Sequence, residues 1–90
     1  MPGTTKYPCH CCGFLTLGEA PFGFEARPYQ TWEICPVCFW EDEDWRYDET
    51  AGGANSVKLS DARKNFHEFG AIERRLVEWT RPPLPGERPS

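Results

Sequence analysis

The chain has 90 residues and a formal net charge of −4, from 14 acidic and 10 basic side chains. A chain this short forms one domain at most and buries a limited core, so a metal staple would add substantially to its stability. Residues 1–57 contain three basic and nine acidic side chains, and this half would repel a phosphate backbone, which excludes nucleic acid as the expected partner.

The first cysteine cluster follows Tyr7 and Pro8 and contains a hook formed by Cys9 and Cys12. Two cysteines separated by two residues can direct both sulfurs at one ion. Gly13 suits the turn after this hook because glycine tolerates positive φ. The apolar residues that follow, up to Gly18, are compatible with a β-strand.

A second cysteine hook lies further along the chain. In residues 22–26, apolar side chains alternate with Gly23 and Glu25, a pattern typical of a weak second strand or an ordered loop. Pro28 interrupts this pattern. Residues 29–34 are rich in β-branched and aromatic side chains, so they are the best strand candidate. This predicted strand leads directly to the second hook, Cys35 and Cys38.

Cys9, Cys12, Cys35 and Cys38 therefore form two C-x2-C hooks, and their spacing predicts one tetrahedral metal site. The N-terminal residues are polar and lack the apolar core of a signal peptide, and no apolar run approaches membrane-spanning length. We therefore expect a cytoplasmic protein, in which reduced thiols favour a metal over disulfides. Zinc is the expected ion and iron the alternative, since all-sulfur tetrahedral sites accept both. Zinc binding is worth on the order of 10 kcal/mol at neutral pH, so the metal-free chain is expected to be largely unfolded.

Cys11 is the remaining thiol. It could replace Cys9 or Cys12 as a ligand, act as a redox-active thiol, or be a spare small residue in the turn. The spare-residue interpretation is favoured because the hook already uses both flanking positions. His10 and His67 are weaker candidates for a fourth ligand, since four well-spaced thiols are available.

Residues 41–44 are four consecutive carboxylates. They lack the alternating ligand positions and the turn glycine of an EF-hand loop, so we expect a solvated acidic face, with a basic protein surface as its one functional use. Among the four tryptophans, Trp32, Trp40 and Trp79 are expected in the core, with Trp40 as a lid over the sulfurs. For Trp45, the core and a protein-contact surface are equally supported.

The C-terminal part is predicted to be helical. After a flexible connection at residues 50–56, Ser60 is the expected N-cap of a helix that ends at Gly70. Apolar residues at helical spacing predict a second helix over 71–79. The prolines beyond it stop that helix.

The domain boundary is expected after this second helix. Residues 1–80 would form the metal-binding domain, and residues 81–90, with four prolines, would form an extended or disordered tail.

Longer blocks of the sequence also form a pattern. They are residues 7–17, 29–42, 52–55, 59–66 and 69–71. Together they resemble the bacterial cysteine-rich CPCC domain family over roughly residues 7–80. His10 stands where that family usually has proline, which keeps every cysteine but loosens the turn. The resemblance implies a small metal-binding domain and names no reaction.

These observations predict an α+β domain with a zinc-ribbon-like or rubredoxin-like β-hairpin core, two metal knuckles and one or two C-terminal helices. Four protein ligands leave no open position on a metal, and the two histidines offer no recognisable nucleophile and base, so no enzymatic activity is expected. Our first hypothesis is a non-enzymatic interaction module that presents an acidic, aromatic-rich surface to an unknown protein partner. One alternative is a rubredoxin-like iron electron carrier, although Phe39 stands where that fold usually has glycine. A less favoured alternative is a thiol-disulfide protein that uses Cys11 and Cys12.

Overall fold

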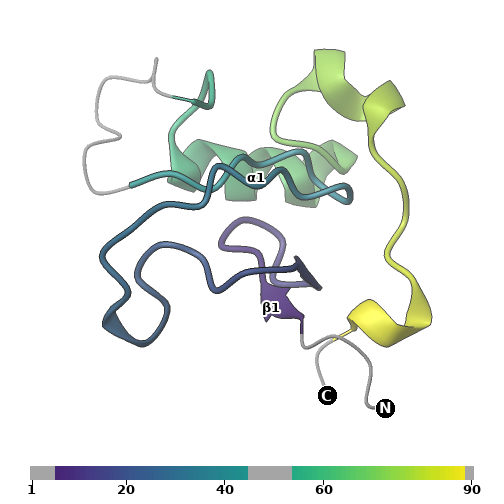
Figure 1. Ribbon diagram of the computed structural model, residues 1–90. Coiled ribbons are helices and arrows are strands. Elements are labelled where there is room, and N and C mark those ends of the chain that lie inside the picture. The colour runs from purple at the N-terminus through teal and green to yellow at the C-terminus, as the bar shows by residue number, and fades with distance from the viewer. Residues whose placement is uncertain (1–5, 45–53, 89–90) are drawn as a thin grey trace.

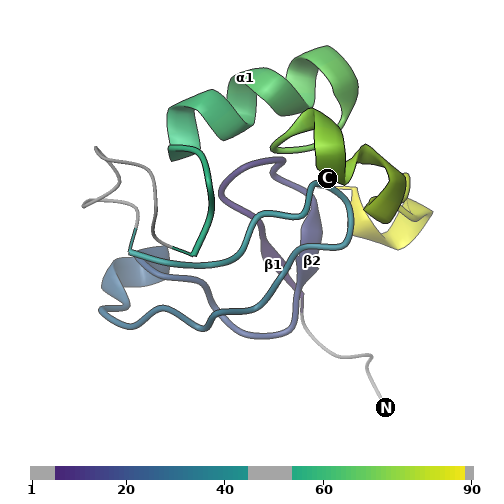
Figure 2. The same cartoon turned by 90° about the horizontal axis from the view of Figure 1, so that it is seen from above.

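The computed structural model describes residues 6–44 and 54–88 (Figure 1). In chain order the elements are β1 (Tyr7–Pro8), β2 (Leu15–Leu17), the 3-10 turn η1 (Phe24–Ala26), helix α1 (Leu59–Phe69), and the 3-10 helices η3 (Arg74–Trp79) and η4 (Pro85–Glu87). Both views place α1 along one side of the β1-β2 hairpin, while η3 and the segment after it run down a neighbouring flank (Figures 1 and 2).

The two named strands form a small antiparallel hairpin, in which β2 falls on a predicted strand and β1 on residues not predicted as one. Tyr7 lies opposite Leu17 and Pro8 opposite Leu15, with a shift of register between the two pairs. Pro8 fits here because a two-stranded sheet leaves one side of each strand unpaired, where a missing N–H costs nothing. The loop that joins β1 to β2 contains the first cysteine hook.

The strand predicted over residues 29–34 is wrong in extent. Its one β-pairing is an isolated bridge between Ile34 and Glu41. Trp32 has φ of 62°, which interrupts the pleat, and the amide of Thr31 donates to the Asp42 carboxylate at 2.7 Å instead of to a neighbouring strand. The hydrogen bond from the Thr31 amide to the Asp42 side chain therefore outweighed the high β-propensity of this segment.

Residues 22–26 form an ordered loop, the second of the two predicted alternatives. Gly23 has φ of 83° and precedes η1, in which Glu25 also has positive φ. Asp42 fastens the start of this loop from outside, because its carboxylate oxygens accept the Phe22 amide at 3.1 Å.

The first predicted helix is confirmed, with a different start. α1 begins at Leu59, so Ser60 lies inside the first turn and Lys58 takes the N-cap position without a side-chain hydrogen bond. Gly70 ends the helix as predicted, with φ of 90° and its amide donating to the Phe66 carbonyl at 2.9 Å. Leu59 and Ala62 are buried on the inner face.

The second predicted helix is shorter and of another type. It starts at Arg74 and is a 3-10 helix rather than an α-helix from residue 71. Ile72 explains the late start, because its amide donates to the Cys38 carbonyl at 3.0 Å and its carbonyl accepts the Asn65 side chain at 2.8 Å. Both backbone groups of Ile72 are therefore engaged outside a helix.

One core holds the cysteines together with apolar residues from the hairpin, α1 and η3. Its most buried members include Leu17, Trp40 and Ala71. Trp40 is 1% exposed, as predicted for the core. The same prediction is wrong for Trp32 and Trp79, which are 52% and 64% exposed. The prediction for Trp45 falls outside the described residues.

The acidic run is not a solvated face at Asp42 and Glu43, which are 1% and 7% exposed. Glu43 accepts hydrogen bonds from the Ala54 amide at 2.9 Å and the Asn55 side chain at 2.8 Å. Asn55 is itself buried, so the described end of the predicted flexible connection is fixed in place. The two carboxylates act as acceptors that hold irregular backbone where no sheet partner is present.

The described part of the predicted tail turns back on the molecule. The amide of Arg81 donates to the Pro36 carbonyl at 3.1 Å, and its guanidinium donates two hydrogen bonds to Glu87, at 2.8 and 2.7 Å. η4 lies against β2. The boundary placed at residue 80 stays a prediction.

Within the described ranges, no helix has both the length and the apolar character needed to cross a membrane.

Asp42→Ala tests the role of the buried carboxylate. The change removes the carboxylate that accepts the amides of Phe22 and Thr31, and we expect the free energy of unfolding to fall by about 3 kcal/mol. Urea denaturation of the metal-loaded protein measures this fall. Glu68→Ala, which removes an exposed carboxylate from α1, is the control and should change the value by less than about 0.5 kcal/mol. Equal values for the two variants would contradict the assignment.

Candidate metal centre

The structure brings together the four cysteines of the two hooks. Their Sγ atoms all lie within 4.8 Å of one another, with Cys9 and Cys38 at 3.5 Å and Cys12 and Cys35 at 3.7 Å. Four sulfurs about 2.3 Å from a central ion stand roughly 3.8 Å apart in a regular tetrahedron. The residues present therefore fit a tetrahedral all-sulfur site, and the four cysteines could bind one metal ion.

The first knuckle is a tight turn closed by two backbone hydrogen bonds. The Gly13 amide donates to the Cys9 carbonyl at 2.9 Å, and the Cys9 amide donates to the Phe14 carbonyl at 3.0 Å. Gly13 has φ of 80°, so a residue without Cβ stands where the turn requires a left-handed conformation.

The second knuckle repeats this arrangement. The Phe39 amide donates to the Cys35 carbonyl at 2.8 Å, and the Cys35 amide donates to the Trp40 carbonyl at 2.9 Å. Phe39 has φ of 75° and takes the place of Gly13. The absence of glycine therefore does not prevent the turn, because the half-buried Phe39 ring packs against the core and offsets the backbone strain.

The four clustered cysteines are largely shielded from solvent. Cys35 and Cys38 are fully buried, Cys9 is nearly so, and Cys12 is partly exposed. Trp40 belongs to the same buried cluster. Its predicted place directly over the sulfurs stays a prediction.

Two donors from the protein reach the sulfurs. The Cys11 amide points at the Cys9 Sγ atom at 3.4 Å, and the Thr16 hydroxyl donates to the Cys35 Sγ atom at 3.0 Å. Thr16 was missed by sequence reasoning, although a buried threonine between two leucines of a short strand is a usable signal. Such donors orient sulfur ligands and stabilise their thiolate form.

The thiols of the four clustered cysteines differ in the direction of their pKa shifts. Hydrogen bonds from neighbouring thiols, Cys12 first, hold the pKa of the Cys35 thiol well below its ordinary value, and Thr16 adds to this effect. The pKa values of Cys9, Cys12 and Cys38 are raised, chiefly by hydrogen bonds to neighbouring thiols and also by burial. A divalent ion would have to release the remaining protons as it binds.

The other candidate ligands lie outside the group of four. Cys11 is buried beside the cluster without belonging to it. The His10 side chain is hydrogen-bonded to the Phe22 carbonyl, and His67 is exposed on α1. Among the described residues, the grouping suited to a metal consists of cysteines alone.

Three distant residues brace the knuckle backbones. The Arg63 side chain donates to the His10 carbonyl at 2.8 Å, and the amides of Ile72 and Arg81 donate to the carbonyls of Cys38 and Pro36. The C-terminal half therefore supports both halves of the site through main-chain acceptors that no sequence motif reveals.

Substitutions at Phe39 test the left-handed conformation of the second knuckle. Phe39→Gly should be more stable than Phe39→Ala by about 1 kcal/mol, because both lose the ring but only glycine tolerates positive φ. The matched pair at the exposed helical residue Lys64 should show the opposite order, with alanine favoured by about 1 kcal/mol. Thermal unfolding of the four metal-loaded variants measures both differences. The same order at the two positions would rule out the left-handed turn.

No curated protein and no solved structure matches the chain. A family model described as cysteine-rich CPCC matches residues 7–87, which include both knuckles, α1 and the described segment beyond residue 80. This match bears out the resemblance seen in the sequence blocks. The chain belongs to the cysteine-rich CPCC family.

Proposed function

We propose that Cys9, Cys12, Cys35 and Cys38 hold one structural Zn²⁺ ion in a zinc-ribbon-like domain of the bacterial cytosol. The observation that carries this proposal is the tetrahedral spacing of the four sulfurs in a buried cluster. When bound, the ion supplies a cross-link between two knuckles, because each knuckle contributes two of its ligands. Four protein ligands leave no position for water or substrate, which supports a non-enzymatic role.

Iron is the competing ion, since a site of four sulfurs also suits an electron carrier. The second knuckle adopts the same turn as the first, so Phe39 no longer argues against a rubredoxin-like geometry. The metal content and the colour of the purified protein distinguish the two ions.

Metal analysis of protein made under iron-replete conditions tests the proposed ion. We expect one equivalent of zinc and a colourless protein, and we expect chelation to unfold the chain. Cys35→Ser should lose the metal, whereas Cys11→Ser, the matched control, should retain it. A coloured protein with one equivalent of iron would replace zinc with the electron carrier.

We also propose that the domain acts by binding a protein partner. Three large side chains of one segment are exposed: Tyr29 at 73%, Trp32 at 52% and Ile34 at 46%. We call these three residues the aromatic segment. Aromatic side chains are enriched where proteins meet, and two of these three exposed residues, Tyr29 and Trp32, are aromatic.

The backbone at Trp32 adds to this support. A bulky residue with positive φ costs roughly 1 kcal/mol, and the half-exposed ring of Trp32 gains little burial in return. The conformation is held from outside, because the Trp32 amide donates to the Asp42 carbonyl at 3.1 Å. Strain that the surroundings impose on an exposed aromatic residue is characteristic of binding surfaces.

Charge indicates the kind of partner. The half of the sequence that contains the aromatic segment has nine acidic and three basic side chains, and four thiolates around a divalent ion add further negative charge. This excess of acidic side chains favours a basic protein over nucleic acid as the partner.

Thiol-disulfide chemistry at Cys11 and Cys12 finds less support. Cys11 is 8% exposed, so an incoming disulfide has little access to its sulfur. Cys12 is one of the four clustered cysteines and would be withdrawn from such chemistry by a bound metal.

Trp32→Ala tests the proposed binding surface. Capture of a partner from native lysate of the source organism by the immobilised, zinc-loaded chain should fall at least fivefold, because central aromatic residues dominate interface energies. Trp79→Ala, which removes another exposed tryptophan from a different segment, should capture as the parent does. Metal content and unfolding free energy should be unchanged in both. Loss of capture in Trp79→Ala alone would place the binding surface at Trp79 instead of Trp32. Absence of specific capture by the parent chain would overturn the binding role.

A further inference from the structure

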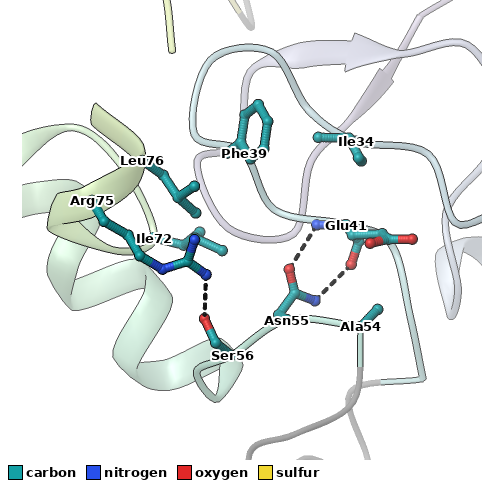
Figure 3. Close-up of a pocket in the computed structure, with 9 residues that line it drawn as sticks. All are labelled: Ile34, Phe39, Glu41, Ala54, Asn55, Ser56, Ile72, Arg75 and Leu76. Atoms are coloured by element: carbon teal, nitrogen blue, oxygen red, sulfur yellow. Dashed lines mark hydrogen bonds between the residues drawn. The ribbon is translucent and has the colours of Figure 1, made fainter. Parts of the chain in front are cut away.

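A pocket lies between the second knuckle, the segment 54–56 and η3 (Figure 3). Its volume is about 170 Å³. We call it the knuckle pocket. Ile34 of the aromatic segment forms part of its wall, so the pocket adjoins the proposed binding surface.

Apolar side chains make up the larger share of the walls of the knuckle pocket, and polar side chains make up the rest. Phe39 of the second knuckle, Ile72 before η3 and Leu76 within η3 line it, with Ile34 opposite Leu76 (Figure 3). Asn55 also lines it, but its amide group is fully engaged, accepting from the Glu41 amide and donating to the Glu41 carbonyl and the Glu43 carboxylate, each at 2.8 Å. The interior therefore favours an aliphatic chain over a polar group.

Two charged side chains, Arg75 and Glu41, lie at the rim of the knuckle pocket, and only Arg75 has an ion-pair partner among the described residues. Arg75 is already ion-paired with Glu73 at 2.9 Å, and its guanidinium lies 3.5 Å from the Ser56 hydroxyl. The Glu41 carboxylate, on the side of the pocket away from Arg75, forms no hydrogen bond or ion pair with a described residue (Figure 3). Desolvation, together with the neighbouring charge of Glu43, raises the pKa of the Glu41 carboxyl.

We propose that the knuckle pocket receives one lysine or arginine side chain of a protein partner, with its aliphatic stem against Phe39, Ile72 and Leu76 and its cationic head at the Glu41 carboxylate. This inference rests on the proposed binding function and names the side chain that the surface recognises. Long basic side chains combine an apolar stem and a charged tip in this way.

Charge complementarity distinguishes this occupant from the others. An anionic group would face the Glu41 carboxylate, which pairs with no cation among the described residues, and the buried Glu43, while Arg75 is already ion-paired with Glu73. A wholly apolar side chain would cover the Glu41 carboxylate without pairing it, which is unfavourable for a charge. The stem of a basic side chain can pack on the apolar walls while its charged head pairs with Glu41 at the rim.

Amide NMR of the full zinc-loaded chain tests this proposal with a short acetylated peptide, Gly-Val-Lys-Val-Gly-amide, and its norleucine analogue, which keeps the stem and lacks the ammonium. We expect the lysine peptide to shift the amides of Ile34, Phe39, Ile72 and Leu76. The norleucine peptide should bind at least fivefold more weakly. Glu41→Gln should weaken the lysine peptide about fivefold, as expected for a partly exposed ion pair, whereas the matched control Glu68→Gln should leave it unchanged.

Equal affinity of the two peptides, unchanged affinity in Glu41→Gln, or shifts confined to other parts of the molecule would each overturn the pocket assignment. The binding function fails separately, when the parent chain captures no specific partner. A partner whose capture depends on Trp32, together with no response of the pocket amides to the lysine peptide, would leave the aromatic segment in place and remove the knuckle pocket from recognition.

Discussion

The contact between two pairs of cysteine sulfurs is the constraint from which the rest of the structure follows. Cys9 meets Cys38 and Cys12 meets Cys35, across 29 and 23 positions of the chain. Closing loops of this length costs conformational entropy that the short hairpin cannot return by itself. A cross-link at the sulfurs would offset that cost at one point, which explains how so little regular secondary structure can hold a folded shape.

Buried carboxylates perform a second structural task in place of regular secondary structure. Asp42 accepts the amides of Phe22 and Thr31, and Glu43 accepts the amide of Ala54 and the side chain of Asn55. In a larger sheet, neighbouring strands would receive such donors. Here the acidic run after the second knuckle anchors both the preceding loop and the segment leading to α1, so its negative charge is directed inward at backbone donors.

These constraints also shape the surface that we propose for binding. Asp42 binds the backbone around Trp32 and fixes that residue in a left-handed conformation with its ring half exposed. The second knuckle places Phe39 and Glu41 beside η3, where the knuckle pocket forms. The residues that fix the backbone and those proposed to bind a partner therefore lie in the same short segment.

The sequence by itself determined the features that depend on local spacing. Two C-x2-C hooks, the glycine that ends α1 and the helical apolar pattern are local, so the four clustered cysteines, strand β2 and the first helix could be predicted from residues alone. The positions of Trp32, Asp42 and Thr16 were decided by tertiary structure. Each depends on a hydrogen bond to a residue at least ten positions away, and neither hydrophobicity nor propensity encodes such a partner. A tryptophan expected in the core is therefore exposed, and a carboxylate expected in solvent is buried, because backbone donors brought close by folding outweighed the preferences of the individual side chains.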